Sequence, residues 1–207
     1  MNAPVMQAPA FFDQVPPIVV HDALAQLLGA AADGRIAYRY IDAVKLAGHS
    51  CPTVAGAWLM TRAALARLYP DCLPQRGGVR VQMCEAEDAG VAGVIAAVAT
   101  LVTGAAGRAG FKGLAGMHRR SDLLSFGIAM QGQMRFTRLD DGRTVEVSHH
   151  TEAVPSPSGL RPLMQAALAP AAAEAARTAF ARAWQERVRQ ILIEHADDPS
   201  LIVVHEA

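Results

Sequence analysis

The longest apolar stretch of this chain runs from residue 89 to residue 107 and reads AGVAGVIAAVATLVTGAAG. Its length raises the question of a membrane span, because about 20 apolar residues cross a bilayer as a helix. Gly and Ala make up most of it, and their small side chains gain little free energy in lipid but let backbones approach closely. We therefore expect a buried helix over residues 89–103, packed against the rest of the protein rather than in a membrane.

Composition narrows the class of protein further. The 207 residues are 52% hydrophobic, enough for one domain with a core or for a core with an appendage. Lys and Arg (19) balance Asp and Glu (19), so no global field draws the chain to nucleic acid or to an anionic membrane. The N-terminal segment MNAPVMQAPAFFDQVPP lacks the basic and apolar regions of a signal peptide, which predicts a cytoplasmic protein with an extended arm.

The order of the predicted elements indicates an α+β fold. Apolar residues at helical spacing predict a helix over 18–32, and a second helix over 53–69 ends before Pro70. Residues 79–83 alternate like a half-buried strand, and Asp141-Gly142 between two alternating runs predicts a β-hairpin. Because helices and strands do not alternate regularly, we expect helices packed on a small sheet that contains this hairpin.

A segment rich in Pro and Ser, TEAVPSPSGLRP, marks a boundary near residues 151–162. The Ala-rich sequence that follows predicts a short helix and then a long one, separated at Pro170. The tail SLIVVHEA could add an edge strand. These features predict an α+β core over 1–150 and a helical extension over 151–207.

The segment GHSCP, residues 48–52, carries the chemistry that stands out most. His49 and Cys51 are two residues apart, directly before a predicted helix whose N-terminus favours the thiolate form of a cysteine. Imidazole and thiolate together suit zinc or another transition metal. From spacing alone, an equally good interpretation is that His49 caps the helix and Cys51 fills a gap in the core.

This segment resembles the GHxCPG signature of the FmdE family, whose name comes from formylmethanofuran dehydrogenase. Further segments agree with the family in their order: TVAGAWLMTRAALARL, VRVQMCEAEDAGV, AAVATLVTG, GFKG and SDLLSFG. The resemblance covers roughly residues 20 to 150. It implies an α+β core that is frequently dimeric, with a metal site in which His49 and Cys51 are ligands.

Other positions depart from the family pattern. The Pro-Gly of the signature is Pro52-Thr53 here, and further cysteine and aspartate positions of the family fall on Ala89, Ala92 and Ala105. Cys84, on the predicted strand before Ala89, is the residue that could substitute as a third ligand. No cysteine follows Cys84, so the C-terminal zinc ribbon of some relatives is missing.

Polar residues elsewhere could complete a site. His118 in GMHRRSD is a candidate third ligand or acid–base group, and Lys112 and Arg119 would bind an anionic substrate or cofactor through charge-assisted hydrogen bonds. Glu85 follows a strand, where catalytic carboxylates often lie. The alternatives are a solvated basic loop and an acid that stabilises the next helix. His149-His150, at the end of the hairpin, is expected at the surface.

Three functions remain open at this point. The first is an FmdE-like protein that binds zinc or another transition metal through His49 and Cys51, as an accessory or catalytic component of a metal-dependent pathway. The second is a metal-free enzyme with Cys51 as nucleophile and His49 or His118 as base. The third is a sensor or carrier that binds haem or a metal without catalysis. A small-molecule ligand fits each of them.

A homodimer is expected, with the N-terminal arm or the C-terminal helix exchanged between the two chains. The neutral overall charge favours self-association, since little colloidal repulsion opposes it. Motifs of nucleotide-binding folds and of the common hydrolases are missing from the sequence, so those functions have no support.

Overall fold

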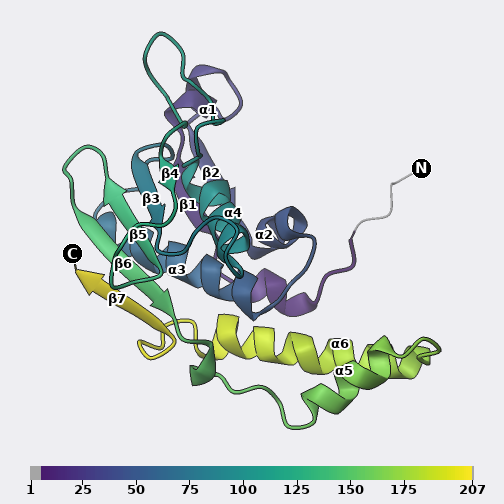
Figure 1. Ribbon diagram of the computed structural model, residues 1–207. Coiled ribbons are helices and arrows are strands. Elements are labelled where there is room, and N and C mark those ends of the chain that lie inside the picture. Colours follow the sequence, from purple (N-terminus) through teal and green to yellow (C-terminus); the bar gives the residue numbers. More distant parts are fainter. Residues whose placement is uncertain (1–5, 207) are drawn as a thin grey trace, which may run out of the picture.

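A computed structural model describes residues 6–206 of the chain. It has an α+β fold in which one sheet has five strands in the order β4-β3-β5-β6-β7, and a smaller sheet pairs β1 with β2 (Figure 1). All neighbours in the larger sheet are antiparallel except β3 and β4. The elements are η1 (Ala10–Gln14), β1 (Ile18–His21), α1 (Ala23–Leu27), β2 (Arg35–Tyr38), α2 (Tyr40–Ala47), α3 (Pro52–Leu68), β3 (Val79–Met83), α4 (Ala92–Thr103), β4 (Leu124–Ser125), β5 (Met134–Arg138), β6 (Thr144–His149), η2 (Thr151–Ala153), α5 (Leu160–Leu168), α6 (Glu174–Arg189), η3 (Gln190–Glu194) and β7 (Ile202–Glu206).

Helix α3 forms the centre of the core. Trp58, Leu59 and Met60 are almost fully buried, and the helix contacts α4 as well as β5, β6 and β7 of the larger sheet. Pro52 stands at its first turn, where a missing N–H costs nothing, and Pro70 follows its end. The prediction of a helix over 53–69 is confirmed.

Helix α4 confirms that the small-residue stretch is a buried helix. Its inner face, which includes Ile95, Val98 and Val102, lies in the core, and Gly104 ends the helix in the left-handed conformation with φ 72°. Within residues 6–206, the helices fall short of the length and hydropathy that a membrane crossing requires.

Strands β5 and β6 form the predicted hairpin. Phe136 pairs with Val145, and Gly142 in the connecting turn has φ 75°, a conformation that glycine adopts without steric cost. The predicted edge strand is also present, since β7 pairs with β6 in an antiparallel arrangement. Helices α5 and α6 are separate, as the proline at residue 170 predicts, and they form a hairpin that extends from the core (Figure 1).

The predicted helix over residues 18–32 is wrong except for residues 23–27, which form α1. Residues 18–21 form β1, in which Val20 pairs with Ile36 of β2. The helix begins only after Asp22, because this side chain accepts hydrogen bonds from the N–H groups of Leu24 and Ala25. β-Branched residues fit a strand as well as a helix, so the pairing with β2 decides the outcome.

The last part of the chain is joined closely to the first. Strand β7 completes the sheet, and Val188, Ile191 and Leu192 are buried in the same core as α3. The packing is therefore continuous between the two parts. A domain boundary at residue 150 stays a prediction.

Candidate functional site

The GHSCP segment lies in a tight connection between α2 and α3. Gly48 ends α2 with φ 75°, and its N–H donates to the carbonyl of Val44. Cys51 is the N-cap of α3, and Pro52 occupies the first helical position. Glycine after one helix and proline at the start of the next are the residues that these positions favour. The local sequence therefore places His49 and Cys51 at the N-terminus of α3.

The His49 side chain is exposed, and its Nδ1 lies 2.9 Å from the carbonyl oxygen of Ala47. Because a carbonyl only accepts, we assign the proton to Nδ1, which leaves a lone pair on Nε2. A metal-ligating histidine generally donates its other N–H to a carbonyl or carboxylate in this way. His49 therefore has the chemistry of a ligand, and it does not cap α3.

The Cys51 side chain performs the capping. Cys51 is 8% exposed, and its Sγ accepts a hydrogen bond from the N–H of Val54 at 3.4 Å. The N-terminus of a helix favours negative charge, and so does a backbone N–H that points at sulfur. The sulfur therefore faces the electropositive start of α3, where it could bind a cation or attack carbon.

Ser50, between these two residues, is held on two sides. Its Oγ lies 3.0 Å from the hydroxyl of Tyr40, and its carbonyl oxygen accepts from Trp184 Nε1 at 3.0 Å and from Gln185 Nε2 at 3.1 Å. Burial raises the pKa of Tyr40, so this hydroxyl stays neutral. Helix α6 therefore reaches back to the motif, and sequence reasoning had no signal for a contact that spans 134 residues.

Cys84 and Glu85 directly follow β3. The N–H of Cys84 donates to Gln133, the Glu85 carbonyl accepts from Gly127, and the Glu85 side chain is exposed. Residues 6–206 contain no group of three or more His, Cys, Asp or Glu residues that could hold a metal ion. The expected set of His49, Cys51 and Cys84 is therefore not assembled as a three-residue metal site within one chain.

The other predicted site residues share one loop, residues 104–122, between α4 and β4. Lys112 and Arg119 are exposed, and His118 is half-buried with φ 59°. Lys112 donates to the carbonyl of Arg108, and Arg119 forms an ion pair with Asp122 at 3.3 Å. In the described part of the chain, the hydrogen bonds of Lys112 and Arg119 stay within this loop. The interpretation as a basic surface loop fits this placement.

His149 is half-buried, whereas the sequence predicted it at the surface. A Cβ placed on Gly56 of α3 would lie 2.0 Å from its Nδ1, so the ring packs directly on the helix backbone. Its Nε2 is buried and has no hydrogen-bond partner within residues 6–206. This burial lowers the pKa of His149 to about 4, so the ring is neutral at physiological pH. Alternation along a strand sends His149 inward and leaves His150 outside, where its Nδ1 contacts Glu152 at 3.1 Å.

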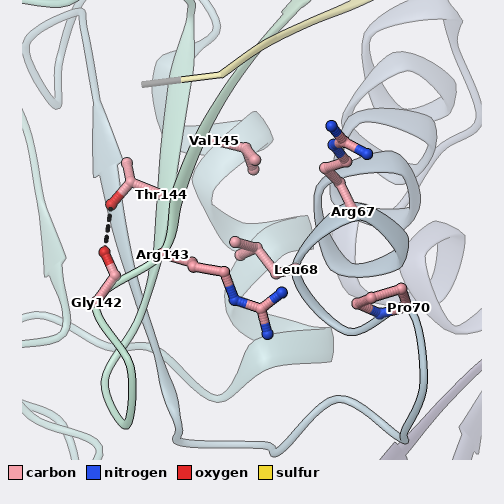
Figure 2. A pocket seen from close by; sticks show the side chains of 7 residues that line it. All are labelled: Arg67, Leu68, Pro70, Gly142, Arg143, Thr144 and Val145. Atoms are coloured by element: carbon pink, nitrogen blue, oxygen red, sulfur yellow. Dashed lines mark hydrogen bonds between the residues drawn. The ribbon is translucent and has the colours of Figure 1, made fainter.

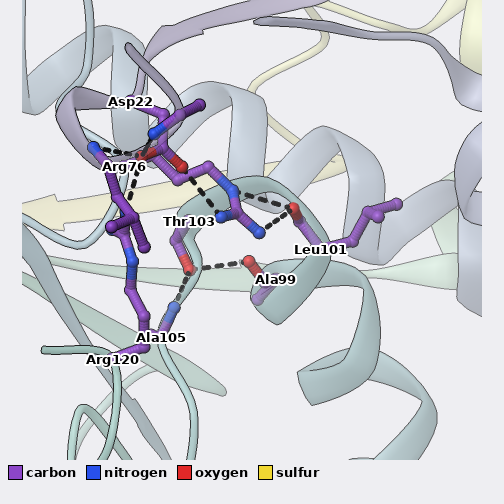
Figure 3. A network of polar contacts seen from close by, with 9 residues as sticks. Asp22, Arg76, Ala99, Leu101, Thr103, Ala105 and Arg120 are labelled. Atoms are coloured by element: carbon purple, nitrogen blue, oxygen red, sulfur yellow. Dashed lines mark hydrogen bonds and ion pairs between the residues drawn. The ribbon is translucent and has the colours of Figure 1, made fainter. Parts of the chain in front are cut away.

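A buried ion network lies beside the loop (Figure 3). Asp22 Oδ1 accepts from Arg120 at 2.7 Å, and Oδ2 accepts from Arg76 at 3.0 Å. Burial alone would raise the pKa of Asp22, but the Ala25 N–H and the two guanidinium groups outweigh it, so this pKa is lowered. Arg76 also donates to the carbonyl of Leu101 at the end of α4. The network connects α1, α4 and the loop, which is a structural role.

A cavity of about 430 Å³ lies at the other end of α3 (Figure 2). It is lined by Arg67, Leu68 and Pro70 and by the turn from Gly142 to Val145. A helix of 17 residues is about 25 Å long, so this cavity is remote from Cys51. Arg143 is engaged by Asp141 at 2.7 Å, and the predicted site residues do not line the cavity.

Comparison of the chain with protein-family models finds no match, and comparison with the curated proteins finds no relative. The resemblance to the FmdE family therefore rests on the motifs in the sequence and on their order. The α+β fold agrees with that resemblance, but a fold class is shared by proteins of many functions. The function must therefore be inferred from His49 and Cys51.

Proposed function

We propose that this chain is an FmdE-like protein that binds a transition metal, zinc by default, through His49 Nε2 and Cys51 Sγ. The observation that supports this most is the hydrogen bond from His49 Nδ1 to the Ala47 carbonyl. It leaves the lone pair of Nε2 available to bind a metal. The sulfur of Cys51 stands two residues further on, at the start of α3.

The surroundings of the motif favour an ordered pair of ligands. Ser50 is fixed by Tyr40 from the core and by Trp184 and Gln185 from α6. Residues whose backbone is held in place lose less conformational entropy when they bind an ion. These contacts therefore hold the connection between α2 and α3 in place, which lowers the entropy cost of binding an ion there.

Two protein ligands leave zinc open to further ones. Zinc sites in proteins are mostly four-coordinate, so the remaining positions would be filled by water, a small molecule or another chain. A zinc ion with open positions can polarise a carbonyl or activate water. With positions open in this way, the proposed zinc would fit an accessory or catalytic component of a metal-dependent pathway rather than a closed structural site.

One specific contact supports the alternative of a metal-free enzyme. The Val54 N–H points at Cys51 Sγ, and the N-terminus of α3 favours negative charge there, so Cys51 could act as a nucleophile. In that case His49, the exposed neighbour, would be its base. Metal content and cysteine reactivity separate the two functions.

The test is a zinc titration of the full-length chain against a competing chelator. Cys51→Ser is the informative variant, because serine is a good N-cap and keeps the start of α3 intact. We expect about one zinc per chain in the wild type, and affinity at least about tenfold lower in Cys51→Ser and in His49→Gln. Cys72→Ser removes an exposed thiol elsewhere and should bind as the wild type does.

Unchanged zinc affinity in both Cys51→Ser and His49→Gln would refute the proposal. Zinc-free wild type whose Cys51 is rapidly alkylated at neutral pH would support the nucleophile instead. A Soret band in the purified protein would indicate haem, the remaining alternative.

A further inference from the structure

The buried ion network beside α4 carries more positive than negative charge. Arg76 and Arg120 both pair with Asp22, at 3.0 and 2.7 Å, so one carboxylate balances two guanidinium groups (Figure 3). A Cβ placed on Gly104 would lie 3.2 Å from Arg76 Nη1 and 3.3 Å from Arg120 Nη1, so the two cations are close neighbours. Burial and the charge of Arg76 outweigh Asp22 and lower the pKa of Arg120. A further anion beside this network would therefore be stabilised.

Arg76 is the member of the network that reaches solvent. Its side chain is 22% exposed, against 8% for Arg120 and 4% for Asp22. A guanidinium group has five N–H donors. Arg76 directs one N–H from Nε and one from Nη2 at the Leu101 carbonyl, and one from Nη1 at Asp22, so two remain unused within residues 6–206. Besides its structural role, Arg76 can therefore bind a carboxylate through charge-assisted hydrogen bonds.

Arg76 lines a groove between α2, α4 and β4. The volume of the groove is about 350 Å³, and pockets that hold small molecules measure about 300–1,000 Å³. Its apolar surface comes from Leu46 of α2, Ala97 of α4, Leu124 of β4 and Phe126. Apolar walls around a charged group favour an amphipathic ligand, because its apolar part leaves water while its charge is paired.

The groove also presents an acid, Glu87, whose side chain is exposed. Among the described residues, Arg76 and Glu87 are the charged side chains of the lining, and they form no ion pair with each other. Glu85 and Asp88, exposed neighbours in the sequence, add negative charge to the same segment. A ligand with only a negative charge would be repelled by this segment, whereas a ligand with both charges would be attracted to both sides of the groove.

We propose that this groove binds a small zwitterion with an apolar side chain, the chemistry of a free aliphatic amino acid. The carboxylate accepts hydrogen bonds from the unused N–H groups of Arg76 and offsets the excess charge of the network. The ammonium group faces Glu87, and the apolar side chain contacts Leu124 and Phe126. The site uses neither His49 nor Cys51, so it does not depend on metal binding.

The test is isothermal titration calorimetry of the full-length chain with L-leucine at neutral pH. The buffer contains EDTA, so that leucine cannot bind through a metal. We expect one saturable site per chain. The analogue 3-methylbutylamine lacks the carboxylate and should bind at least about tenfold more weakly, and 4-methylpentanoate lacks the ammonium group and should bind at least about threefold more weakly. Either analogue binding as tightly as leucine would show that a zwitterion is not the ligand.

Two variants with matched controls locate the site. Glu87→Gln removes the charge that faces the ammonium group and should raise the Kd for leucine about threefold, whereas Glu85→Gln, outside the lining, should not. Ala97→Phe fills the groove from an exposed position of α4 and should raise this Kd at least about tenfold. Its control is Ala66→Phe at an exposed position of α3, which should bind as the wild type does.

Arg76→Lys tests the cation itself. Lysine keeps a positive charge beside Asp22 but lacks the planar group of N–H donors, so the Kd for leucine should rise at least about tenfold. If this variant does not fold, the binding of 3-methylbutylamine to the wild type decides the carboxylate contact. No saturable binding up to about 10 mM leucine, or binding that Ala97→Phe leaves unchanged, would overturn the proposal. Cys51→Ser should bind leucine normally, so this outcome is separable from that of the zinc titration.

Discussion

Because of His149, we expect the free energy of unfolding to depend on pH. Its ring packs on Gly56, its Nε2 has no partner in the described part of the chain, and burial holds its pKa at about 4. The ordinary pKa of an exposed histidine is about 6.5. Between these two values the unfolded chain binds a proton that the folded chain does not.

The free energy of unfolding should therefore be fully present above about pH 6.5 and fall as the pH drops toward 4. The loss is on the order of 3 kcal/mol when both pKa values have been passed. Urea unfolding at a series of pH values measures it. His149→Gln should flatten this dependence, whereas His150→Gln, a change at the exposed neighbour, should not. Equal pH dependence in His149→Gln and the wild type would show that the ring is not held neutral.

Helix α6 acts on the motif through two side chains. Trp184 and Gln185 both donate to the Ser50 carbonyl, so a helix of the C-terminal part positions residues between α2 and α3. Trp184 also packs against Phe180, with ring centroids 5.6 Å apart. The hydrogen bond and the aromatic contact can be separated by substitution.

Trp184→Phe should keep the aromatic contact and remove one hydrogen bond to Ser50. We expect the free energy of unfolding to fall by about 0.5–1.5 kcal/mol, and zinc affinity to fall by up to about tenfold because the motif is held less firmly. The chelator competition assay measures the second effect. Phe180→Leu is the control, since it disturbs the ring contact and leaves both donors to Ser50 in place. If Trp184→Phe bound zinc as tightly as the wild type, α6 would have no influence on metal binding by the motif.

The elements that local sequence could predict are those with strong local boundaries. Helix α3 lies between prolines, and the β5–β6 hairpin has Asp141-Gly142 at its turn. Strand β1 escaped prediction because Val19 and Val20 fit either structure until β2 pairs with them. His49 and Cys51 could be singled out as candidates because their spacing is local. Trp184 could not be, because only the tertiary fold brings it to the motif.

Residues 6–206 share one continuous core, and the candidate site lies at its edge. Strand β7 adds to the sheet beside β6, and α6 packs its buried end on the same core that contains α3. The motif therefore lies where the helical extension meets the α+β core.

The most direct test of metal binding by the motif is X-ray absorption at the zinc edge of the zinc-loaded, full-length chain. We expect a sulfur neighbour at about 2.3 Å and a nitrogen neighbour at about 2.0–2.1 Å, with the sulfur lost in Cys51→Ser. Zinc surrounded only by oxygen and nitrogen in the wild type, with the same spectrum in Cys51→Ser, would contradict the account.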